Sequence, residues 1–281
     1  MNRQDEVRRL LQMSAAELRE QAGNRLLVLP DLDALHRHFA ESIAAEIRAN
    51  NLRGLPTRFI LPVGPVGQYP LLAEIVNRER LDLRRCWLFM MDEHCDEGGV
   101  VLPADHPLSF RRTFAELFTS RVSPELLPPA EQMIFPSQQN LPTLKAQIAD
   151  AGGIDTTYGG IGIHGHLAYN EPEPGVRESD PRRVRLNDFT RTINAMRAEI
   201  GGNLENYPRY GLTLGMRQLL GARRVRLYCR NGIELDWANT ILRLALLGQS
   251  GDDYPVTHLR DHGDYLIVTD EHTARPPRFV V

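Results

Sequence analysis

The alternation of apolar and polar residues first predicts helices at the N-terminal end of the chain. Residues 2–24 fit a pair of amphipathic helices, and the second begins at Ser14, because Glu17 follows three residues later as in a capping box. A longer helix is predicted from Asp31 to Asn50, where apolar residues recur at helical spacing (Leu35, Phe39, Ile43 and Ile47). We therefore treat residues 1–24 as an N-terminal helical extension.

Short, mostly apolar runs further along the chain predict buried β-strands. Helical stretches separate these runs, which cover residues 59–63, 86–91, 157–163, 225–229 and 265–269. Strands that alternate with helices form a parallel sheet, so the pattern predicts an α/β protein. No repeat or long linker interrupts the pattern, and we expect residues 25–281 to form a single domain. Polar residues gather just after the strands end, where open α/β sheets bind their ligands.

The composition is that of an ordinary globular protein and excludes several function classes. Apolar residues make up 42% of the chain and charged residues 25%, which argues against disorder. The formal net charge of −3 provides no basic field, so we expect no nucleic-acid partner. Three cysteines without CxxC spacing indicate neither a disulfide framework nor a zinc knuckle. Without a signal peptide or a segment of transmembrane length, a cytoplasmic protein with no membrane partner is expected.

The densest motif is the glycine- and histidine-rich segment 159–172 (GGIGIHGHLAYNEP). Its glycines, including Gly165 between two histidines, permit backbone conformations and close ligand approaches that other residues do not. His166 can act as an acid or base near neutrality, and Glu171 can orient it or tune its pKa. The alternative is a glycine-rich turn with structural histidines. Because glycines, two histidines and a carboxylate rarely coincide without use, the motif favours function.

A second motif, residues 90–94 (MMDEH), follows a predicted strand directly. Strand alternation places Asp92 and Glu93 on opposite sides of the chain. A partly desolvated carboxylate at such a position can take a proton from carbon. Taken alone, the motif fits an ordinary helix N-cap equally well.

Metal and thiol chemistry are less favoured by the sequence. The candidate metal ligands are His94, His106, His164 and His166. They show no HxxxH-type spacing, so we expect no metal ion. Cys95 has no evident histidine partner that would activate it as a nucleophile.

Several segments, in order, resemble the glucosamine-6-phosphate deaminase family. Residues 89–94 (FMMDEH) are similar to the family motif FNMDEY, and residues 159–172 are similar to GGVGxDGHIAFNEP. Residues 105–110 (DHPLSF) match EHPxSY, and residues 210–215 (YGLTLG) match YALTVG. The resemblance covers about residues 25–270. The Asn-Glu-Pro ending favours this family over the related 6-phosphogluconolactonases, whose loop is closer to DGHTASLFP.

The resemblance implies a fold, a reaction and a set of site residues. The fold is a modified Rossmann-like three-layer α/β sandwich with a mainly parallel sheet, and neither metal nor organic cofactor is used. Asp92 would move a proton between sugar carbons C1 and C2, while His166, assisted by Glu171 and with His164 beside it in the relay, would open the pyranose ring. Arg197 ends the lid segment 190–197 and would hold the phosphate. The implied substrate-binding residues are Gly64, Val66, Glu93, Gly165 and Arg197, and the partner is a small sugar phosphate; a homo-oligomer remains an open option.

Three departures from the family pattern concern the catalytic relay and the phosphate. His164 stands where the family has an acid, and a histidine cannot hold a neighbouring imidazolium as a carboxylate does. The phosphate loop LPTGGTP is replaced by residues 61–67 (LPVGPVG), which lack both hydroxyl donors, and Pro65 also lacks a backbone N–H. The family lysine is absent from residues 230–235 (RNGIEL), where Arg230 is the candidate replacement.

Three hypotheses follow from the sequence. The first is a divergent sugar-phosphate isomerase or deaminase acting through Asp92. The second is a lactonase-like hydrolase in which His166 activates water. The third is a sugar-phosphate-binding protein that has lost the relay; the retained Asp92, His166 and Glu171 argue against it, whereas His164 and the altered phosphate loop argue for it.

Overall fold

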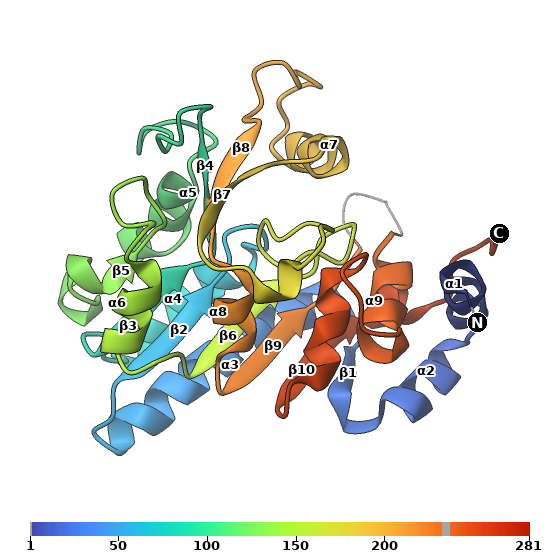
Figure 1. Ribbon diagram of the computed structural model, residues 1–281. Helices are drawn as coiled ribbons and strands as arrows, with labels where there is room; N and C mark the ends of the chain where they lie inside the picture. Colours follow the sequence, from blue (N-terminus) through green and yellow to red (C-terminus); the bar gives the residue numbers. More distant parts are fainter. Residues whose placement is uncertain (1, 232–236) are drawn as a thin grey trace.

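A seven-stranded parallel sheet forms the centre of the molecule (Figure 1). The computed structural model describes residues 2–231 and 237–281. Within them the strand order is β1-β10-β9-β6-β2-β3-β5. The bounds are β1 Leu26–Leu29, β2 Thr57–Leu61, β3 Cys86–Met90, β5 Met133–Ile134, β6 Thr156–Gly160, β9 Arg224–Tyr228 and β10 Tyr265–Asp270. All five predicted strands are present, and the predicted α/β class with a mainly parallel sheet is confirmed.

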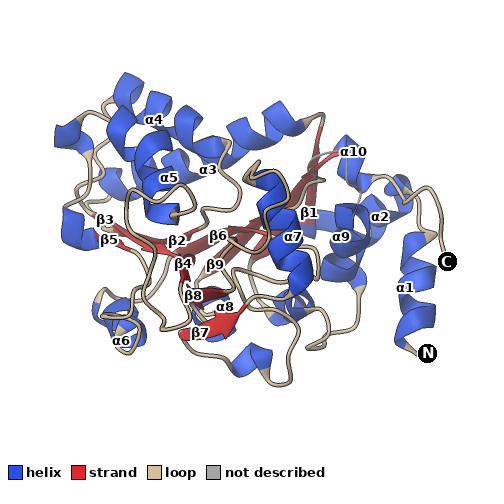
Figure 2. Cartoon of the chain, turned by 90° about the horizontal axis from the view of Figure 1, so that it is seen from above, coloured by secondary structure: helices blue, strands red, loops and turns tan. Residues whose placement is uncertain are grey.

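Helices cover both faces of this sheet and make the fold a three-layer sandwich (Figure 2). Strand alternation supplies both cores: on β2, Phe59 and Leu61 belong to the apolar cluster under α3 and α4, whereas Ile60 belongs to the cluster under α9. The helices are α1 Arg3–Leu11, α2 Ala15–Ala22, α3 Leu32–Leu52, α4 Gln68–Glu79, α5 Phe110–Leu117, α6 Leu144–Asp150, α7 Asp188–Arg197, α8 Met216–Leu220, α9 Trp237–Leu247 and α10 Glu271–Ala274. Short 3₁₀ turns lie at Gly23–Arg25, Thr119–Arg121, Pro124–Leu126, Ala130–Gln132, Val176–Glu178 and Pro255–Asp261.

A second, antiparallel sheet stands above the carboxyl ends of the large sheet, together with α7 (Figure 1). Its strand order is β4-β8-β7, with bounds β4 Asp92–Cys95, β8 Tyr210–Thr213 and β7 Arg182–Arg185. The sequence did not predict this sheet. The motif of residues 90–94 therefore joins two strands: β3 ends at Met90, and β4 begins at Asp92.

The predicted N-terminal helices are present and pack against the main core. Ser14 and Glu17 form the expected capping box at the start of α2. Leu10 and Leu18 are buried and belong to the same apolar cluster as α9. The extension thus shares a hydrophobic core with the rest of the chain. Among the described residues, no helix combines the length and apolarity needed to cross a membrane.

A buried arginine ties the N-terminal helices, α9 and the C-terminal segment together. The Arg243 side chain is fully buried and donates hydrogen bonds of 2.9–3.1 Å to the carbonyls of Met13, Asn239, Ala274 and Arg275. No carboxylate among the described residues forms a salt bridge with it. Its charge is therefore satisfied by backbone dipoles alone.

We expect Arg243→Ala to lower the free energy of unfolding by about 3–5 kcal/mol, because it leaves a cavity and four carbonyls without their donor. Urea unfolding measures the loss. Arg275→Ala is the matched control: this exposed side chain can be removed while the Arg275 carbonyl stays, so the change should remain within about 0.5 kcal/mol. Equal stabilities of Arg243→Ala and the wild type would contradict this role.

Candidate functional site

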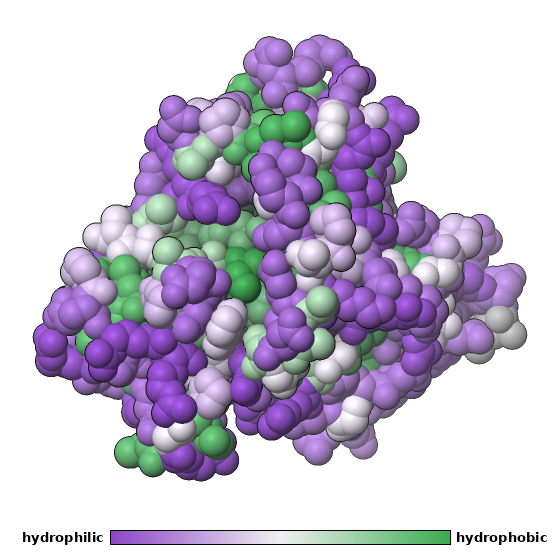
Figure 3. Space-filling view, turned by 60° about the vertical axis from the view of Figure 1, so that its left-hand side comes forward, coloured by the Kyte–Doolittle hydropathy of each residue, from purple (hydrophilic) through white to green (hydrophobic). Residues whose placement is uncertain are grey.

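A cavity of about 310 Å³ opens where β2, β3 and β6 end. Its floor comes from the loops that follow these strands, and α5, α7 and the loop before β8 close it from above. Apolar surface gathers in the recess between the part formed by the small sheet with α7 and the part formed by the large sheet (Figure 3). The lining residues are Pro62, Val63, Gly64, Pro65, Met91, Asp92, His94, Pro107, Leu108, Phe110, Thr113, Gly160, Ile161, Gly162, His166, Ala168, Tyr169, Asn194, Arg197, Ala198, Ile200 and Tyr207. The cavity thus lies at the sheet edge that the strand pattern predicts.

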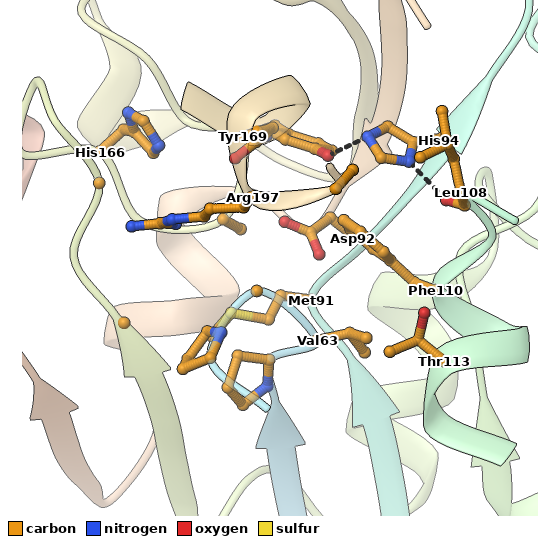
Figure 4. Close-up of a pocket in the computed structure, with 18 of the residues that line it drawn as sticks. Val63, Met91, Asp92, His94, Leu108, Phe110, Thr113, His166, Tyr169 and Arg197 are labelled. Carbon is orange, nitrogen blue, oxygen red and sulfur yellow. Dashed lines mark hydrogen bonds between the residues drawn. The ribbon is translucent and has the colours of Figure 1, made fainter. Parts of the chain in front are cut away.

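Asp92 carries the carboxylate that points into this cavity (Figure 4). It begins β4, and only 7% of the residue is exposed. Within residues 2–231 and 237–281 no hydrogen bond reaches its side chain. Burial, with a smaller contribution from the charge of Glu93, raises the pKa of Asp92 to about 8. The group can therefore exchange a proton near neutral pH.

Glu93 lies outside the cavity, contrary to the expectation that it binds substrate. Its carboxylate accepts hydrogen bonds from the backbone N–H groups of Phe110 and Arg111, at 2.8 and 2.9 Å, and from that of His94 at 2.9 Å. It thereby satisfies free N–H groups at the N-terminus of α5. Strand alternation sends Asp92 into the cavity and Glu93 to the helix, so Glu93 has a structural role.

His166 lines the cavity at the end of a tightly folded loop. The N–H of Gly162 donates to the carbonyl of His166 at 2.9 Å, and a Cβ atom on Gly162 would lie 1.9 Å from the His166 ring. Only glycine fits there. The Nδ1 atom of His166 is buried without a described partner. Burial, followed by the nearby charges of His164 and Arg197, lowers the pKa of His166 to about 3, so the imidazole is neutral at pH 7.

The two residues expected to assist His166 lie behind the cavity wall. Glu171 accepts a hydrogen bond from the backbone N–H of Asn187, at 2.9 Å, at the start of α7. His164 lies 3.3 Å from the Asn187 side chain and packs edge-on against Phe189. No described hydrogen bond joins either residue to His166, and the rings of His164 and His166 are 6.3 Å apart. The expected relay is therefore not assembled, and both residues instead contact the segment that begins α7.

Two further expected substrate-binding residues have structural roles. Gly165 has a φ of +67°, a conformation that favours glycine, and its N–H donates to the carbonyl of Gly162. Val66 packs against the core cluster under α3 and α4. Gly64, in contrast, does line the cavity, and the space beside its Cα is open. Of the loop residues implied by the resemblance, only Gly64 is placed to meet a ligand.

A cationic group closes one end of the site. Arg197, at the end of α7, lines the cavity, and its guanidinium lies 6.0 Å from the ring centroid of Trp237. Burial of the guanidinium and the nearby charge of Arg230 lower the pKa of Arg197 to about 10, so it remains cationic. Neither arginine forms a salt bridge with a carboxylate in the described part of the chain. His36 lies near Arg230 and adds a neutral imidazole rather than a charge, because burial and the charge of Arg230 lower its pKa; its buried Nε2 has no described partner.

Arg197 and Arg230, neither of which has a salt-bridge partner in the described chain, provide positive charge suited to binding an anion. The family lysine was sought at residues 230–235, of which 232–235 lie outside the described residues. Arg230, the first residue of the searched segment, is described and is half-buried.

Several polar residues of the cavity were given no role there by the sequence. His94, on β4, lies 2.7 Å from the hydroxyl of Tyr169 and 3.0 Å from that of Tyr207. Asn194 lines the cavity from α7. For His94 and Tyr169 a signal existed, because both lie within the two family-like motifs and differ from the family residue there.

Comparison with known proteins agrees with this architecture. The chain is 30% identical over 262 residues to glucosamine-6-phosphate deaminase of Phocaeicola vulgatus, covering 88% of this chain and 91% of that protein. It is 27% identical over 257 residues to glucosamine-6-phosphate deaminase of Mycolicibacterium smegmatis, covering 89% of this chain and 91% of that protein. No protein-family model matches the chain.

Solved structures share the fold. A monomeric glucosamine-6-phosphate deaminase superimposes with a TM-score of 0.77 at 21% identity, over 89% of this chain and 98% of that one. The 6-phosphogluconolactonase of Thermotoga maritima gives a TM-score of 0.61 at 17% identity, over 88% of this chain and 99% of that one. Both confirm the three-layer α/β fold.

Proposed function

Because the chain belongs to the glucosamine-6-phosphate deaminase family, we propose that it interconverts the aldose and ketose forms of a C6-phosphorylated sugar, releasing ammonia when C2 carries an amine. The observation that carries the proposal is the Asp92 carboxylate, buried in the cavity without a hydrogen-bond partner in the described chain. A cytoplasmic location, where phosphorylated sugars are retained, is part of the proposal.

The reaction requires one proton to move between neighbouring carbons. Asp92 would take the proton from C2 of the open-chain sugar and return it to C1, forming the enol or enamine between the two steps. For an amino sugar, water then adds to the C2 imine and ammonia leaves. Pre-positioning the base in a poorly hydrated cavity favours the transfer, since its carboxylate is not stabilised by hydrogen bonds before the substrate arrives.

His166 would assist ring opening, and Arg197 would hold the phosphate. A neutral imidazole can take the proton of the C1 hydroxyl and pass one to the ring oxygen. Burial and, to a smaller extent, the nearby charges of His164 and Arg197 lower its pKa; a phosphate bound at Arg197 would counteract the contribution of the charges and make His166 a stronger base. Arg230 and His36 would complete the phosphate site in place of the absent loop hydroxyls.

The experiment that tests the proposal is a substrate panel. Amino- and hydroxy-hexose 6-phosphates are assayed for ketose formation and ammonia release, and 6-phosphogluconolactone is assayed for hydrolysis. The proposal expects ketose formation from at least one aldose phosphate. Lactone hydrolysis without isomerisation would identify a hydrolase, and binding without turnover would identify a sugar-phosphate-binding protein; either result would refute the proposal.

The pH dependence of kcat/KM should reflect Asp92. As a base, Asp92 must be ionised, and its pKa is raised to about 8 in the free enzyme. We expect kcat/KM to rise by about tenfold per pH unit below this pKa and to level off above it. Initial rates between pH 5 and 9, at substrate concentrations well below KM, measure the profile. A plateau that already begins near pH 5 would show that the base has an ordinary carboxyl pKa.

His164→Asp tests whether restoring the family acid restores the family relay. We expect no appreciable gain with glucosamine 6-phosphate, together with a lower kcat for the preferred substrate, because an aspartate cannot replace the contact of the His164 ring with Phe189. Kinetics on phosphorylated and unphosphorylated sugars measure both effects. A large gain with glucosamine 6-phosphate would show that His164 merely weakens an otherwise ordinary deaminase.

A further inference from the structure

Three aromatic residues without a role in the proposed reaction form a hydrogen-bonded cluster in the cavity wall. His94, Tyr169 and Tyr207, which we call the tyrosine–histidine wall, all line the cavity that contains Asp92. Both tyrosine hydroxyls lie within hydrogen-bonding distance of the same atom, Nε2 of His94, at 2.7 and 3.0 Å.

The hydrogen-bonding capacity of His94 is too small for both hydroxyls. Its Nδ1 lies 2.8 Å from the carbonyl of Leu108, which only accepts, so Nδ1 carries the hydrogen. Burial lowers the pKa of His94 to about 4, and the ring is therefore neutral. Its Nε2 then offers one lone pair, which accepts one well-directed O–H bond. The second hydroxyl is therefore free to donate to another acceptor, such as Asn194 or a bound ligand.

The wall faces the reacting end of a substrate. In Figure 4, the Arg197 guanidinium lies to one side of Asp92 and His94 to the other, while Tyr169 lies above Asp92 with its hydroxyl directed to His94. A sugar whose phosphate binds at Arg197 and whose C2 lies at Asp92 therefore directs the remaining end of its chain toward the wall.

We propose that the tyrosine–histidine wall recognises an oxygen substituent at C1 or C2 and thereby determines which sugar phosphate is accepted. This inference rests on the proposed function, which places the phosphate at Arg197. Phenol hydroxyls both donate and accept, and so complement a sugar hydroxyl or carbonyl. Relative to the family motifs, this chain has histidine in place of tyrosine at position 94 and tyrosine in place of phenylalanine at position 169. The hydroxyl therefore lies at position 169 in this chain and at position 94 in the family motifs, which changes where a ligand oxygen can be bound.

Ligand analogues that lack one oxygen test the proposal without requiring turnover. Dissociation constants are measured for glucose 6-phosphate, 2-deoxyglucose 6-phosphate and 1,5-anhydroglucitol 6-phosphate, which lacks the C1 hydroxyl. The wild type should bind glucose 6-phosphate about three- to tenfold more tightly than one of the two analogues. In Tyr169→Phe or Tyr207→Phe this preference should fall to about one, while affinity for the deficient analogue changes less than about twofold.

Tyr228→Phe is the matched control. The Tyr228 hydroxyl also lies 3.0 Å from a histidine nitrogen, Nδ1 of His38, but neither residue lines the cavity. This variant should keep the preference of the wild type. Unchanged preferences in both wall variants, or an equal loss of affinity for all three ligands, would overturn the proposal. If the wild type binds no sugar phosphate more tightly than inorganic phosphate, the proposed function fails as well, and the two failures are thereby distinguished.

Discussion

Asp92→Asn should reduce kcat by about 10²–10⁴-fold or more on every sugar that the enzyme accepts, while the fold remains intact. The carboxamide has nearly the same shape but cannot take a proton from carbon. In the described chain, Asp92 is the carboxylate that lines the cavity, and no other carboxylate there can replace it. Steady-state kinetics with the best substrate of the panel measure the loss.

Asp155→Asn is the control for this experiment. Asp155 is as buried as Asp92, at 7% exposure, but it lies before β6, at the opposite edge of the sheet, where it accepts a hydrogen bond from the backbone of Arg58. Its replacement should affect stability and leave kcat nearly unchanged. Near-normal kcat in Asp92→Asn would disprove the assignment of Asp92 as the base.

Asp92→Asn should also stabilise the folded protein above neutral pH. The folded-state pKa of Asp92, about 8, exceeds the ordinary value of 3.8. Between these values the folded state binds the proton that the unfolded state has released, so the stability of the wild type falls as pH rises from about 4 to about 8. Each unit of pKa shift corresponds to about 1.4 kcal/mol. The advantage of Asp92→Asn in urea unfolding should therefore grow between pH 5 and pH 8, and a constant difference would contradict the raised pKa.

Arg197→Ala should raise KM by about 10- to 150-fold and change kcat by less than about threefold. Hydrogen bonds to a charged group contribute about 1.5–3 kcal/mol, and a phosphate remote from the reacting carbons gains equally in the ground and transition states. Arg197→Lys should recover part of the affinity, since it restores the charge without the planar fork. The readout is KM and kcat for the best sugar phosphate, together with inhibition by inorganic phosphate.

Arg217→Ala, on α8 and outside the cavity, is the control and should leave both constants unchanged. A fall in kcat at constant KM in Arg197→Ala would instead place Arg197 in the chemical step or in the closure of α7.

The apolar runs predicted most of the central sheet because buried parallel strands are apolar on both faces. The small sheet was missed for the same reason: β4 (DEHC) and β7 (RRVR) are short and polar, and their pairing with β8 depends on residues distant in the sequence. Edge strand β1 (LLVL) is apolar, but it is only four residues long and partly buried, and it was not predicted.

The site was predicted in part, for reasons that differ between residues. The rule that parallel strands end at a common edge correctly brought Asp92 and His166 to one cavity, and Arg197 joined them as the resemblance implied. The roles of Glu93 and Glu171 were not predictable from their motifs, because each carboxylate satisfies backbone N–H groups of a helix start that follows later in the chain. The contact of Tyr207 with His94 spans 113 residues and has no local signature.

The most direct test of the proposed function follows the hydrogen on C2. Hexose 6-phosphates and glucosamine 6-phosphate, deuterated at C2, are incubated with the enzyme in ordinary water, and the label is followed by NMR. If Asp92 moves a proton between C2 and C1, the wild type will release deuterium to water or transfer it to C1 of the ketose for at least one sugar, and Asp92→Asn will do neither. Complete retention of deuterium at C2 by the wild type, for every sugar that it binds, would contradict the account.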